Sequence, residues 1–468
     1  MHGWQEDAGM DIMAKHKKYT LMTVVLLLIC ACGFYVYKNF MPGRILNIYC
    51  WDNSFRELLA KHYPAYDPET EMIGNVKVRW VVVPYTNHVY QHTLDKALQM
   101  DNLNSNDNVD IFLTESDYIR KYAEAEDVSM ALDKLGIEEK DLRDAFVYTR
   151  DLATDSNGRL RGVSWQAAPS VMIYRRDIAK RVLGSDEPAV VQKHVQTWEA
   201  FEKTAALMKQ AGYHILPGYM DTYRVYWAGV EKPWIAPEGY FVIDPHMEEW
   251  IRQTQRFEAN GYNYPYGLWE TNWNRQVRGD SFCYFGPAWL IKHALMPLSQ
   301  DENLGGTNTY GKWGVCHGPE ASFWGGTWIF AGSKTDNQEL VADIMRTICL
   351  DKQVLTEMAK TDAEFVNDRQ IMSRLAADKS YGMDFLAGQN PYGIMMDAAQ
   401  SIHVSQISSY DQGIHETFHN CFRIYFDGRL PREGAWQKFM ANVWHIYPEL
   451  QGAFFSYKTD GAEGEMDY

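Results

Sequence analysis

The sequence predicts an α/β protein whose two lobes are formed by one continuous chain. Segments rich in β-branched residues alternate with amphipathic helical segments, which indicates βαβ units and a parallel sheet covered on both faces. The 468 residues are 46% hydrophobic and 23% charged, which is typical of a folded globular protein, and the length suggests two to three domains. Because the chain contains no internal repeat and no Pro-rich linker, we expect lobes instead of separate modules.

The first elements are expected to be two strands with a helix between them. Residues 45–51 form an apolar run typical of a buried strand, and residues 76–83 are rich in valine. Ser54 and Glu57 have the spacing of a capping box, so Ser54 is expected to cap the intervening helix. A further helix and a third strand at 109–114 continue the alternation.

The later elements repeat this alternation and then become mainly helical. Residues 162–174 are expected to be extended, and Thr197 has the residue type of an N-cap for a helix that Gly212 ends. Residues 280–331 are rich in glycine and aromatic residues and predict short strands. From about residue 385 onward, the apolar spacing predicts helices.

The charge and the aromatic content point to different classes of partner. The formal net charge is -16, and a surface this negative repels phosphate backbones, so we expect no nucleic-acid partner. The chain contains 16 Trp, 29 Tyr and 20 Phe residues, which together make 14% of the sequence. Aromatic rings fill cores, and they also stack on flat ligand faces, carbohydrate rings included.

Residues 1–40 are expected to hold a signal peptide or a membrane anchor. A basic flank at 15–18 precedes an apolar run at 19–37, close to the roughly 17–25 residues that span a bilayer core. Cys32 lies in the sequence ICACG, which resembles the lipobox of bacterial lipoproteins and makes Cys32 the candidate lipidation site. An uncleaved anchor is the alternative, because apolar residues continue after Cys32. Either segment would tether the protein to the outer face of the cytoplasmic membrane.

The cysteines that follow the apolar run predict neither a disulfide framework nor a metal site. Their spacing is scattered and contains no CxxC pair. We expect five free, buried thiols. These are Cys50, Cys283, Cys316, Cys349 and Cys421.

Several sequence fragments follow one another along the chain in the same order as in one known family. The chain resembles the extracellular solute-binding proteins of bacterial ABC importers, in the carbohydrate-binding group that includes maltose-binding protein. The resemblance covers some 400 residues, and the order of the fragments is more specific than any one of them. The fragments include LNIYCWDNSFRELLAKHYP, VDIFLTESDYIRKYA, LRGVSWQAAPSVMIYRRDIAKRVLG, FCYFGPAWLIKHAL and YFDGRLPREGAWQKF.

The resemblance implies a fold, a function and a set of partners. The implied fold is the two-lobed periplasmic-binding-protein fold of type II, with the ligand cleft between the lobes. Lobe 1 would comprise 44–167 and 290–333, and lobe 2 would comprise 168–289 and 334–460. The implied function is capture of an oligosaccharide and its delivery to an ABC permease, by a monomer that needs no cofactor and is not an enzyme.

Five candidate ligand residues follow two of the expected strands. Trp51, Asp52 and Asn53 lie where the first strand ends, and ligands of open α/β sheets bind outside the carboxyl ends of strands. Glu115 and Asp117 occupy the same kind of position after the third strand, where the family often places an acidic residue. The alternative is that these polar side chains only begin the helices that follow.

The remaining candidates are aromatic, and the family commonly presents a stacking tryptophan at the position of Trp289. Two glycines between Trp324 and Trp328 permit close approach of the backbone to a ligand, although one of these two rings is expected in the core. The candidates are Trp165, Tyr223, Trp227, Trp289, Trp324 and Trp328. Three other tryptophans at apolar spacing are expected in the core, namely Trp80, Trp198 and Trp250.

One motif favours a different class of protein. His415, Glu416 and His419 form an HExxH sequence, which on a helix can bind zinc with the glutamate as general base. No recognisable third ligand follows, and apolar residues beside the histidines favour a surface helix of the second lobe. A membrane-anchored zinc metallopeptidase therefore stays as an alternative, as does a sugar-binding protein that serves a membrane sensor.

Overall fold

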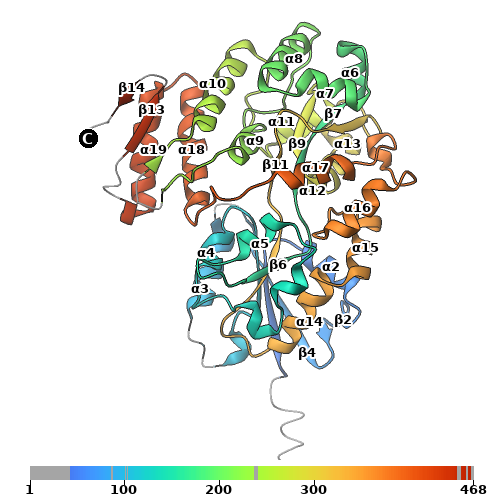
Figure 1. Cartoon of the computed structure of the whole chain (residues 1–468), viewed down its shortest axis with the longest axis vertical. Coiled ribbons are helices and arrows are strands. Elements are labelled where there is room, and N and C mark those ends of the chain that lie inside the picture. The colour runs from blue at the N-terminus through green and yellow to red at the C-terminus, as the bar shows by residue number, and fades with distance from the viewer. Residues whose placement is uncertain are drawn as a thin grey trace, which may run out of the picture. The chain divides into compact units, whose positions relative to one another are not determined.

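The fold is described from a computed structural model (Figure 1). It describes residues 43–85, 88–100, 102, 104–236 and 241–450, together with the backbone of 455–459 and 462–464. The expected signal or anchor segment and Cys32 lie outside these residues. In the described part of the chain, no helix has both the length and the apolar character needed to cross a membrane.

The chain divides into two compact units, of which the smaller combines Met1–Leu46 with Ala65–Arg79. Its described part contains β2 (Tyr66–Asp67), β3 (Met72–Ile73) and the start of β4 (Val76–Val82), which pair as an antiparallel meander. The larger unit contains the rest of the chain and is described from here on.

The first sheet of the larger unit has the strand order β1 (Ile45–Cys50), β5 (Ile111–Thr114), β12 (Trp328–Ala331) and β6 (Gly162–Ser164). β1 and β5 are parallel, as the alternation of strands and helices predicts, but β12 runs antiparallel to β5 and to β6. The sheet is therefore mixed, because the chain returns to it after forming the second sheet. All four residues of β5 are buried, as expected for a strand covered on both faces.

Five helices are close to the first sheet in sequence or in packing: α2 (Ser54–His62), α3 (Val89–Gln99), α4 (Ile119–Ala123), α5 (Val147–Ala153) and α14 (Gln338–Cys349). The expected capping box is not formed at α2. Asn53 occupies the N-cap position without a side-chain bond, and Ser54 is already helical. Instead, Asp52 Oδ1 accepts hydrogen bonds from the Ser54 backbone N–H at 2.8 Å and from its hydroxyl.

The second sheet is built around β7 (Pro169–Arg175), whose seven residues are all buried. Three strands pair antiparallel with it: β9 (Cys283–Gly286), β10 (Trp313–Cys316) and β11 (Ser322–Phe323). Helices α6 (Arg176–Leu183), α7 (Pro188–Val195) and α8 (Trp198–Gln210) follow β7 along the chain. The predicted N-cap of α8 is confirmed, because the Thr197 side chain accepts from the Ala200 N–H at 3.1 Å.

A third region consists of helices that pack through aromatic side chains. Helices α10 (Pro245–Asn260), α18 (Asp411–Phe426) and α19 (Arg432–Ile446) lie side by side in Figure 1. Rings from these helices and from the segment before α10 form the C-terminal aromatic core. Its largest members are Trp227, Trp234, Trp250, Phe418, Trp436 and Phe439.

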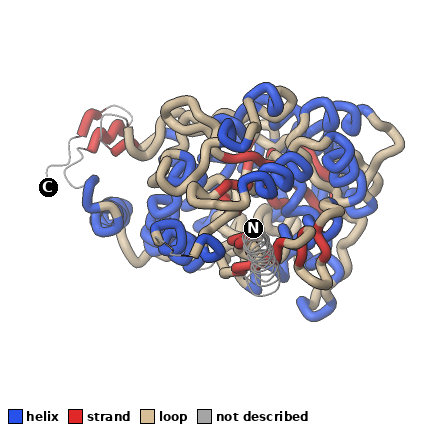
Figure 2. The backbone as a smooth tube through the Cα atoms, turned by 90° about the horizontal axis from the view of Figure 1, so that it is seen from below, coloured by secondary structure: helices blue, strands red, loops and turns tan. Residues whose placement is uncertain are grey.

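Short helices connect these regions, and Figure 2 shows strands in the middle with helices and loops around them, and the last strands at the edge near the C-terminus. The short helices are α9 (Tyr223–Ala228), α11 (Thr271–Arg275), α12 (Ala288–Leu290), α13 (Met296–Gln300), α15 (Lys352–Thr361), α16 (Arg369–Ala377) and α17 (Tyr392–Ser401). The remaining strands are β8 (Phe241–Val242), β13 (Phe455–Thr459) and β14 (Ala462–Gly464). The five cysteines after the apolar run are free and buried, as predicted.

The strand pairing differs from the lobe boundaries expected from the sequence. Within 290–333, which was expected in lobe 1, β10 and β11 pair with β7 of the second sheet, and β12 belongs to the first sheet. Within 334–460, which was expected in lobe 2, α14 packs against β12 and β6 of the first sheet. The difference arises because the chain returns to the first sheet only at β12, after β9, β10 and β11 have all paired with β7.

Candidate functional site

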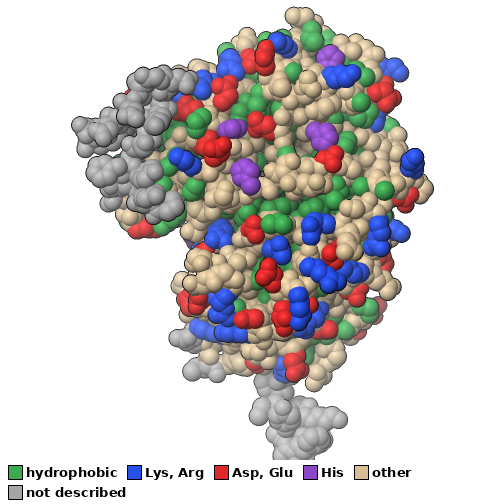
Figure 3. Space-filling model, viewed as in Figure 1, with side chains coloured by type: hydrophobic (Ala, Val, Ile, Leu, Met, Phe, Trp, Pro, Cys, Tyr) green, Lys and Arg blue, Asp and Glu red, His purple; other side chains and the backbone are tan. Residues whose placement is uncertain are grey.

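A cavity of about 1090 Å³ lies within the larger unit, which is the size of a small-molecule site. The residues that follow β1 and β5 line one side, and side chains from α9, α18 and the loops around β9 and β11 line the other. This is the location expected for a ligand of an α/β sheet, outside the carboxyl ends of its strands. On the face drawn in Figure 3, hydrophobic side chains reach the surface in a band across the middle.

The structure brings eight of the eleven predicted ligand residues to this cavity. They are Trp51, Asp52, Glu115, Asp117, Trp165, Tyr223, Trp289 and Trp324. Asn53, Trp227 and Trp328 are not among the lining residues. Asn53 is exposed at the start of α2, and Trp227 stacks on Trp234 inside the C-terminal aromatic core.

Trp328 is the core member of its pair, as expected for one of Trp324 and Trp328. Its side chain is buried, and its Nε1 donates to the Thr149 carbonyl at 2.9 Å. The three tryptophans predicted to be in the core differ from one another. Trp250 is fully buried, whereas Trp80 and Trp198 are only half-buried.

Three tryptophans form one side of the cavity, and we call Trp269, Trp289 and Trp324 the indole wall. The ring centroids of Trp289 and Trp324 are 4.9 Å apart, and the Trp269 ring lies 5.6 Å from Trp324 and 6.2 Å from Trp289. Trp289 Nε1 donates to the Trp324 carbonyl at 2.9 Å, which fixes the direction of its ring. Trp269 is 47% exposed although it lines the cavity, so its ring is available for stacking.

Trp269 was missed by sequence reasoning. It lies in a loop and has a positive φ of 68°, which is uncommon for a residue with a bulky side chain. The signal that could have identified it is the segment GLWETNW, in which a tryptophan stands in a glycine-containing stretch without helical or strand periodicity. Strained backbone of this kind is often found at ligand sites.

The two glycines between Trp324 and Trp328 hold the loop of the indole wall in place. Gly325 and Gly326 both have positive φ values, 66° and 95°. A Cβ atom on Gly326 would lie 3.1 Å from the buried Trp328 ring, so a side chain there has little room. The glycines therefore let one indole reach the core and the other reach the cavity.

Rings and an amide from the first sheet and its connections face the cavity as well. Trp165 stacks on Phe55 with centroids 5.6 Å apart, and Trp51 meets the edge of Tyr90 at 5.6 Å. Gln166 donates through Nε2 to Thr327 Oγ1 at 3.0 Å. These contacts fix rings and polar groups before any ligand arrives.

The best-defined ion pair of the site joins Asp117, after β5, to Arg224 on α9. Both guanidinium terminal nitrogens donate to the two carboxylate oxygens, which is the bidentate geometry of a strong pair. Burial raises the pKa of Asp117, but Arg224 lowers it further, so the pKa lies below its usual value. The pair therefore stays charged and ties the end of β5 to α9.

Glu115, two residues before Asp117, has a raised pKa where Asp117 has a lowered one. It accepts hydrogen bonds from the hydroxyls of Tyr85 and Ser116, each at 3.1 Å. Desolvation, followed by the charge of Asp117, raises the pKa of Glu115 to about 8. Near neutral pH this side chain is therefore mostly protonated and can donate a hydrogen bond to a ligand hydroxyl.

A second charged group lies at the α2 and α15 side of the cavity. Asp362 forms ion pairs with Lys61 and with His62, whose Nε2 lies 2.6 Å from the carboxylate. Lys292 pairs with the buried Glu364 at 3.3 Å. Burial raises the pKa of Asp362, but its bonds to Lys61 and His62 hold that pKa below the usual value.

The HExxH residues lie on α18, so the expected helix is confirmed, and its Glu416 is exposed whereas its other face is buried. His415 is buried, its Nδ1 is hydrogen-bonded to the Tyr223 hydroxyl, and burial lowers its pKa to about 3. Burial also holds the pKa of His419 well below the usual value, and Glu416 pairs with His88. Among the described residues, no group of three or more His, Cys, Asp or Glu side chains could hold a metal ion.

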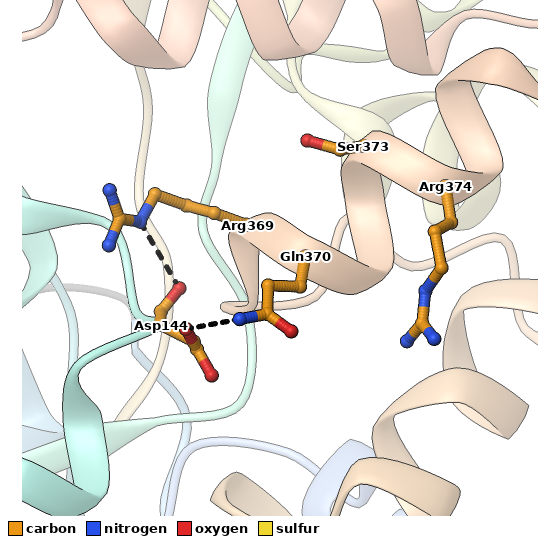
Figure 4. A pocket seen from close by; sticks show the side chains of 5 residues that line it. All are labelled: Asp144, Arg369, Gln370, Ser373 and Arg374. Atoms are coloured by element: carbon orange, nitrogen blue, oxygen red, sulfur yellow. Dashed lines mark hydrogen bonds between the residues drawn. The ribbon is translucent and has the colours of Figure 1, made fainter.

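A second hollow lies at the start of α16 and is lined by Asp144, Arg369, Gln370, Ser373 and Arg374 (Figure 4). Gln370 donates to the Asp144 carboxylate at 2.9 Å, and Arg369 donates to the Asp144 carbonyl. All five side chains are polar or charged, so this hollow offers no apolar face to a solute.

Solved structures support the same fold at low sequence identity. An extracellular solute-binding protein of family 1 is 17% identical, with a TM-score of 0.68 over 86% of this chain and 98% of its own. The ABC transporter associated binding protein of B. animalis subsp. lactis Bl-04, in complex with β-1,6-galactobiose, is 16% identical, with a TM-score of 0.65 over 88% and 98%. The sugar-binding protein MalE of Xanthomonas citri is 14% identical, with a TM-score of 0.63 over 87% and 98%.

These likenesses confirm the predicted α/β fold of the two-lobed solute-binding type. No curated protein matches the chain. The model of one family matches residues 67–366, which is more than half of the chain. The chain belongs to the bacterial extracellular solute-binding proteins.

Proposed function

We propose that this protein captures an oligosaccharide in the cavity and delivers it to the permease of an ABC importer. The observation that carries the proposal is the indole wall, because three indoles within 6.2 Å of one another offer stacking area for sugar rings. Structural relatives that hold β-1,6-galactobiose, lacto-N-biose and maltose support the same ligand class.

The polar groups of the cavity suit the hydroxyls of a sugar. Protonated Glu115 can donate a hydrogen bond, and Asp52 and Gln166 can accept one. A ligand that touches both Asp117 and Arg224 would bind the same two elements that their ion pair joins, so occupancy would favour a closed form that the permease can recognise.

We also propose that residues 1–40 tether the protein outside the cytoplasmic membrane, through a lipid on Cys32 or through an uncleaved anchor. The apolar run and its basic flank support this proposal. In cells fed a labelled fatty acid, Cys32→Ala should lose the label if Cys32 is lipidated. If Cys32→Ala stays in the membrane and the native protein carries no label, the anchor is the uncleaved segment.

The proposed function is tested by calorimetry of the domain from residue 43 onward with a panel of oligosaccharides. We expect at least one glycan to bind and to raise the melting temperature, as a ligand specific for the folded state must. Trp289→Ala should weaken that binding, whereas Trp198→Phe, outside the cavity, serves as the matched control. A panel in which no glycan binds, or in which Trp289→Ala binds as well as the native protein, would contradict the proposal.

A further inference from the structure

The charges that line the cavity restrict the chemical class of its ligand, and this inference rests on the proposed function. Seven carboxylate side chains line the cavity, against three lysine and arginine side chains. The carboxylates are Asp52, Glu57, Glu115, Asp117, Asp362, Glu364 and Glu416. The cations are Lys61, Arg224 and Lys292.

Each of the three cations is already engaged by a carboxylate of the same lining. Arg224 is held by both oxygens of Asp117, Lys61 by Asp362, and Lys292 by Glu364 at 3.3 Å. The Asp117 and Glu364 side chains are largely buried, with 13% and 8% exposure. Removing a cation from either of them would leave a carboxylate in a desolvated place without its partner, which is strongly unfavourable.

The histidines of the lining do not supply a spare cation. His62 and His293 face the same carboxylates as the lysines, Asp362 and Glu364. Burial holds the pKa values of His415 and His419 far below neutrality, so these two rings are uncharged.

An anionic group that entered this cavity would therefore lose its hydration without gaining a counter-ion. It would also meet Asp52 and Glu57, for which the described residues show no lysine or arginine partner, and Glu416, whose partner is His88. Like charges repel each other, and the repulsion is stronger in a partly desolvated site than in water. The -16 net charge of the chain adds a weaker long-range repulsion.

We propose that this site binds a glycan that carries no anionic group, and that it rejects uronates, sulfated sugars and sugar phosphates of the same size. The indole wall takes the sugar rings, and the paired charges leave only hydrogen-bonding capacity for the hydroxyls. The acidic lining therefore makes the site selective, since Asp117, Asp362 and Glu364 each occupy a cation that an acidic sugar would need.

The first experiment compares neutral and acidic glycans by calorimetry at low salt. The probes are galactobiose and maltotriose, their digalacturonate and glucuronate counterparts, and chondroitin disaccharides with and without sulfate, within a larger panel of neutral and acidic oligosaccharides. We expect binding by one or more neutral members and at least tenfold weaker binding by every acidic counterpart. An acidic glycan that binds best overturns this inference and leaves the proposed function standing, whereas a panel without any binder overturns both.

The second experiment releases a cation. Asp362→Asn leaves Lys61 and His62 without their carboxylate, and we expect the affinity for digalacturonate to rise at least tenfold. Asp95→Asn is the matched control, because Asp95 pairs with Lys121 outside the cavity and its loss changes the net charge equally. Equal effects of the two variants would overturn the inference. If circular dichroism shows that Asp362→Asn folds poorly, Asp117→Asn, which releases Arg224, replaces it, with the same expected rise in affinity for digalacturonate.

Discussion

The C-terminal aromatic core and the indole wall contain the same residue types in different surroundings. In the core, Trp234 and Trp250 have 1% and 0% exposure, and both rings contact the ring of Phe418. In the wall, Trp269 is 47% exposed, and Trp289 is held in direction by a hydrogen bond to a backbone carbonyl. A buried ring cannot contact a ligand, whereas a ring that is accessible and fixed in direction is preorganised to bind a ligand.

The difference shows that the many aromatic residues of the chain serve two purposes, which are packing and ligand contact. The core rings pack the helices α10, α18 and α19 together, whereas the wall rings stand on the short helix α12 and on two loops. Mutations in the two groups should therefore separate stability from binding. Four experiments test this separation, and none is expected to have a larger effect than the one before it.

Trp250→Ala should have the largest effect, and it should act on stability. Trp250 is fully buried among Tyr223, Phe418 and Phe426, so its removal leaves a large cavity. We expect a loss of about 3–5 kcal/mol of unfolding free energy, measured by urea denaturation. Glycan affinity of the folded fraction should stay near that of the native protein. A variant that folds normally but does not bind would break the distinction between the two groups.

Asp221→Asn should have an effect of similar size, seen as a change in the pH dependence of stability. Asp221 lies behind the indole wall and accepts from Trp273 Nε1 at 3.1 Å, and the Trp273 ring is 5.2 Å from Trp269. Burial raises the pKa of Asp221 to about 8 in the folded protein, against an ordinary value near 4. The raised pKa of Asp221 therefore stabilises the folded protein fully below about pH 4, and this stabilisation is lost as the pH rises from 4 through 8.

The asparagine variant cannot ionise, so the difference in unfolding free energy between variant and native protein should grow in favour of the variant as the pH rises from 4 to 9. The expected change is up to about 5 kcal/mol, since the pKa is raised by about four units and each unit corresponds to about 1.4 kcal/mol. Urea denaturation at pH 4, 6.5 and 9 measures it, and a constant difference would contradict the assignment. Glycan affinity should change little, because Asp221 is not among the lining residues.

Trp289→Ala should act on binding more than on stability. Its ring is half-buried, so truncation should cost about 1 kcal/mol of unfolding free energy, less than at Trp250. Loss of a stacking face should weaken glycan binding by about 1–3 kcal/mol, which is roughly 5- to 150-fold in Kd by calorimetry. Trp289→Phe keeps an aromatic face and should recover part of the affinity. If Trp289→Ala lowers the unfolding free energy more than it weakens the binding free energy, Trp289 is a packing residue like those of the aromatic core.

The alternation of strands and helices predicted the α/β fold because each element has its own periodicity. The crossings of the chain between the two sheets could not be predicted in the same way. They depend on which strand β10, β11 and β12 pair with, and a short buried strand has the same composition in either sheet. The mixed first sheet and the actual division of 290–333 were missed for this reason.

The candidate site was predicted best where topology alone decides position. Asp52, Glu115 and Asp117 follow strands whose ends meet at one edge of a sheet, and all three line the cavity. To predict which tryptophans line the cavity, the direction of each ring must be known, and that direction depends on long-range packing. Trp227, a predicted ligand residue, turns into the aromatic core, and Trp269, which was not predicted, stands at the cavity on an irregular loop.

Glu416→Gln should have the smallest effect, and it lies on a helix that contributes both to the aromatic core and to the cavity. On α18, Phe418 packs in the aromatic core, while Glu416 lines the cavity and pairs with His88. The bond to Glu416 raises the pKa of His88, against the opposing effects of its partial burial and of Lys121. The pair therefore contributes fully below the ordinary histidine pKa of about 6.5, and its contribution is lost as the pH rises through the raised value.

Because the two side chains are 30% and 47% exposed, water and salt screen the pair, and we expect it to contribute less than about 1 kcal/mol. The difference in unfolding free energy between native protein and Glu416→Gln should be measurable at pH 6, should vanish by about pH 9, and should shrink in 0.5 M salt, roughly five times the concentration at which the Debye length is about 10 Å. Phe418→Ala, two residues along the same helix, should lose several times more stability at every pH. Equal losses from the two variants would mean that α18 does not separate a packing face from a cavity face.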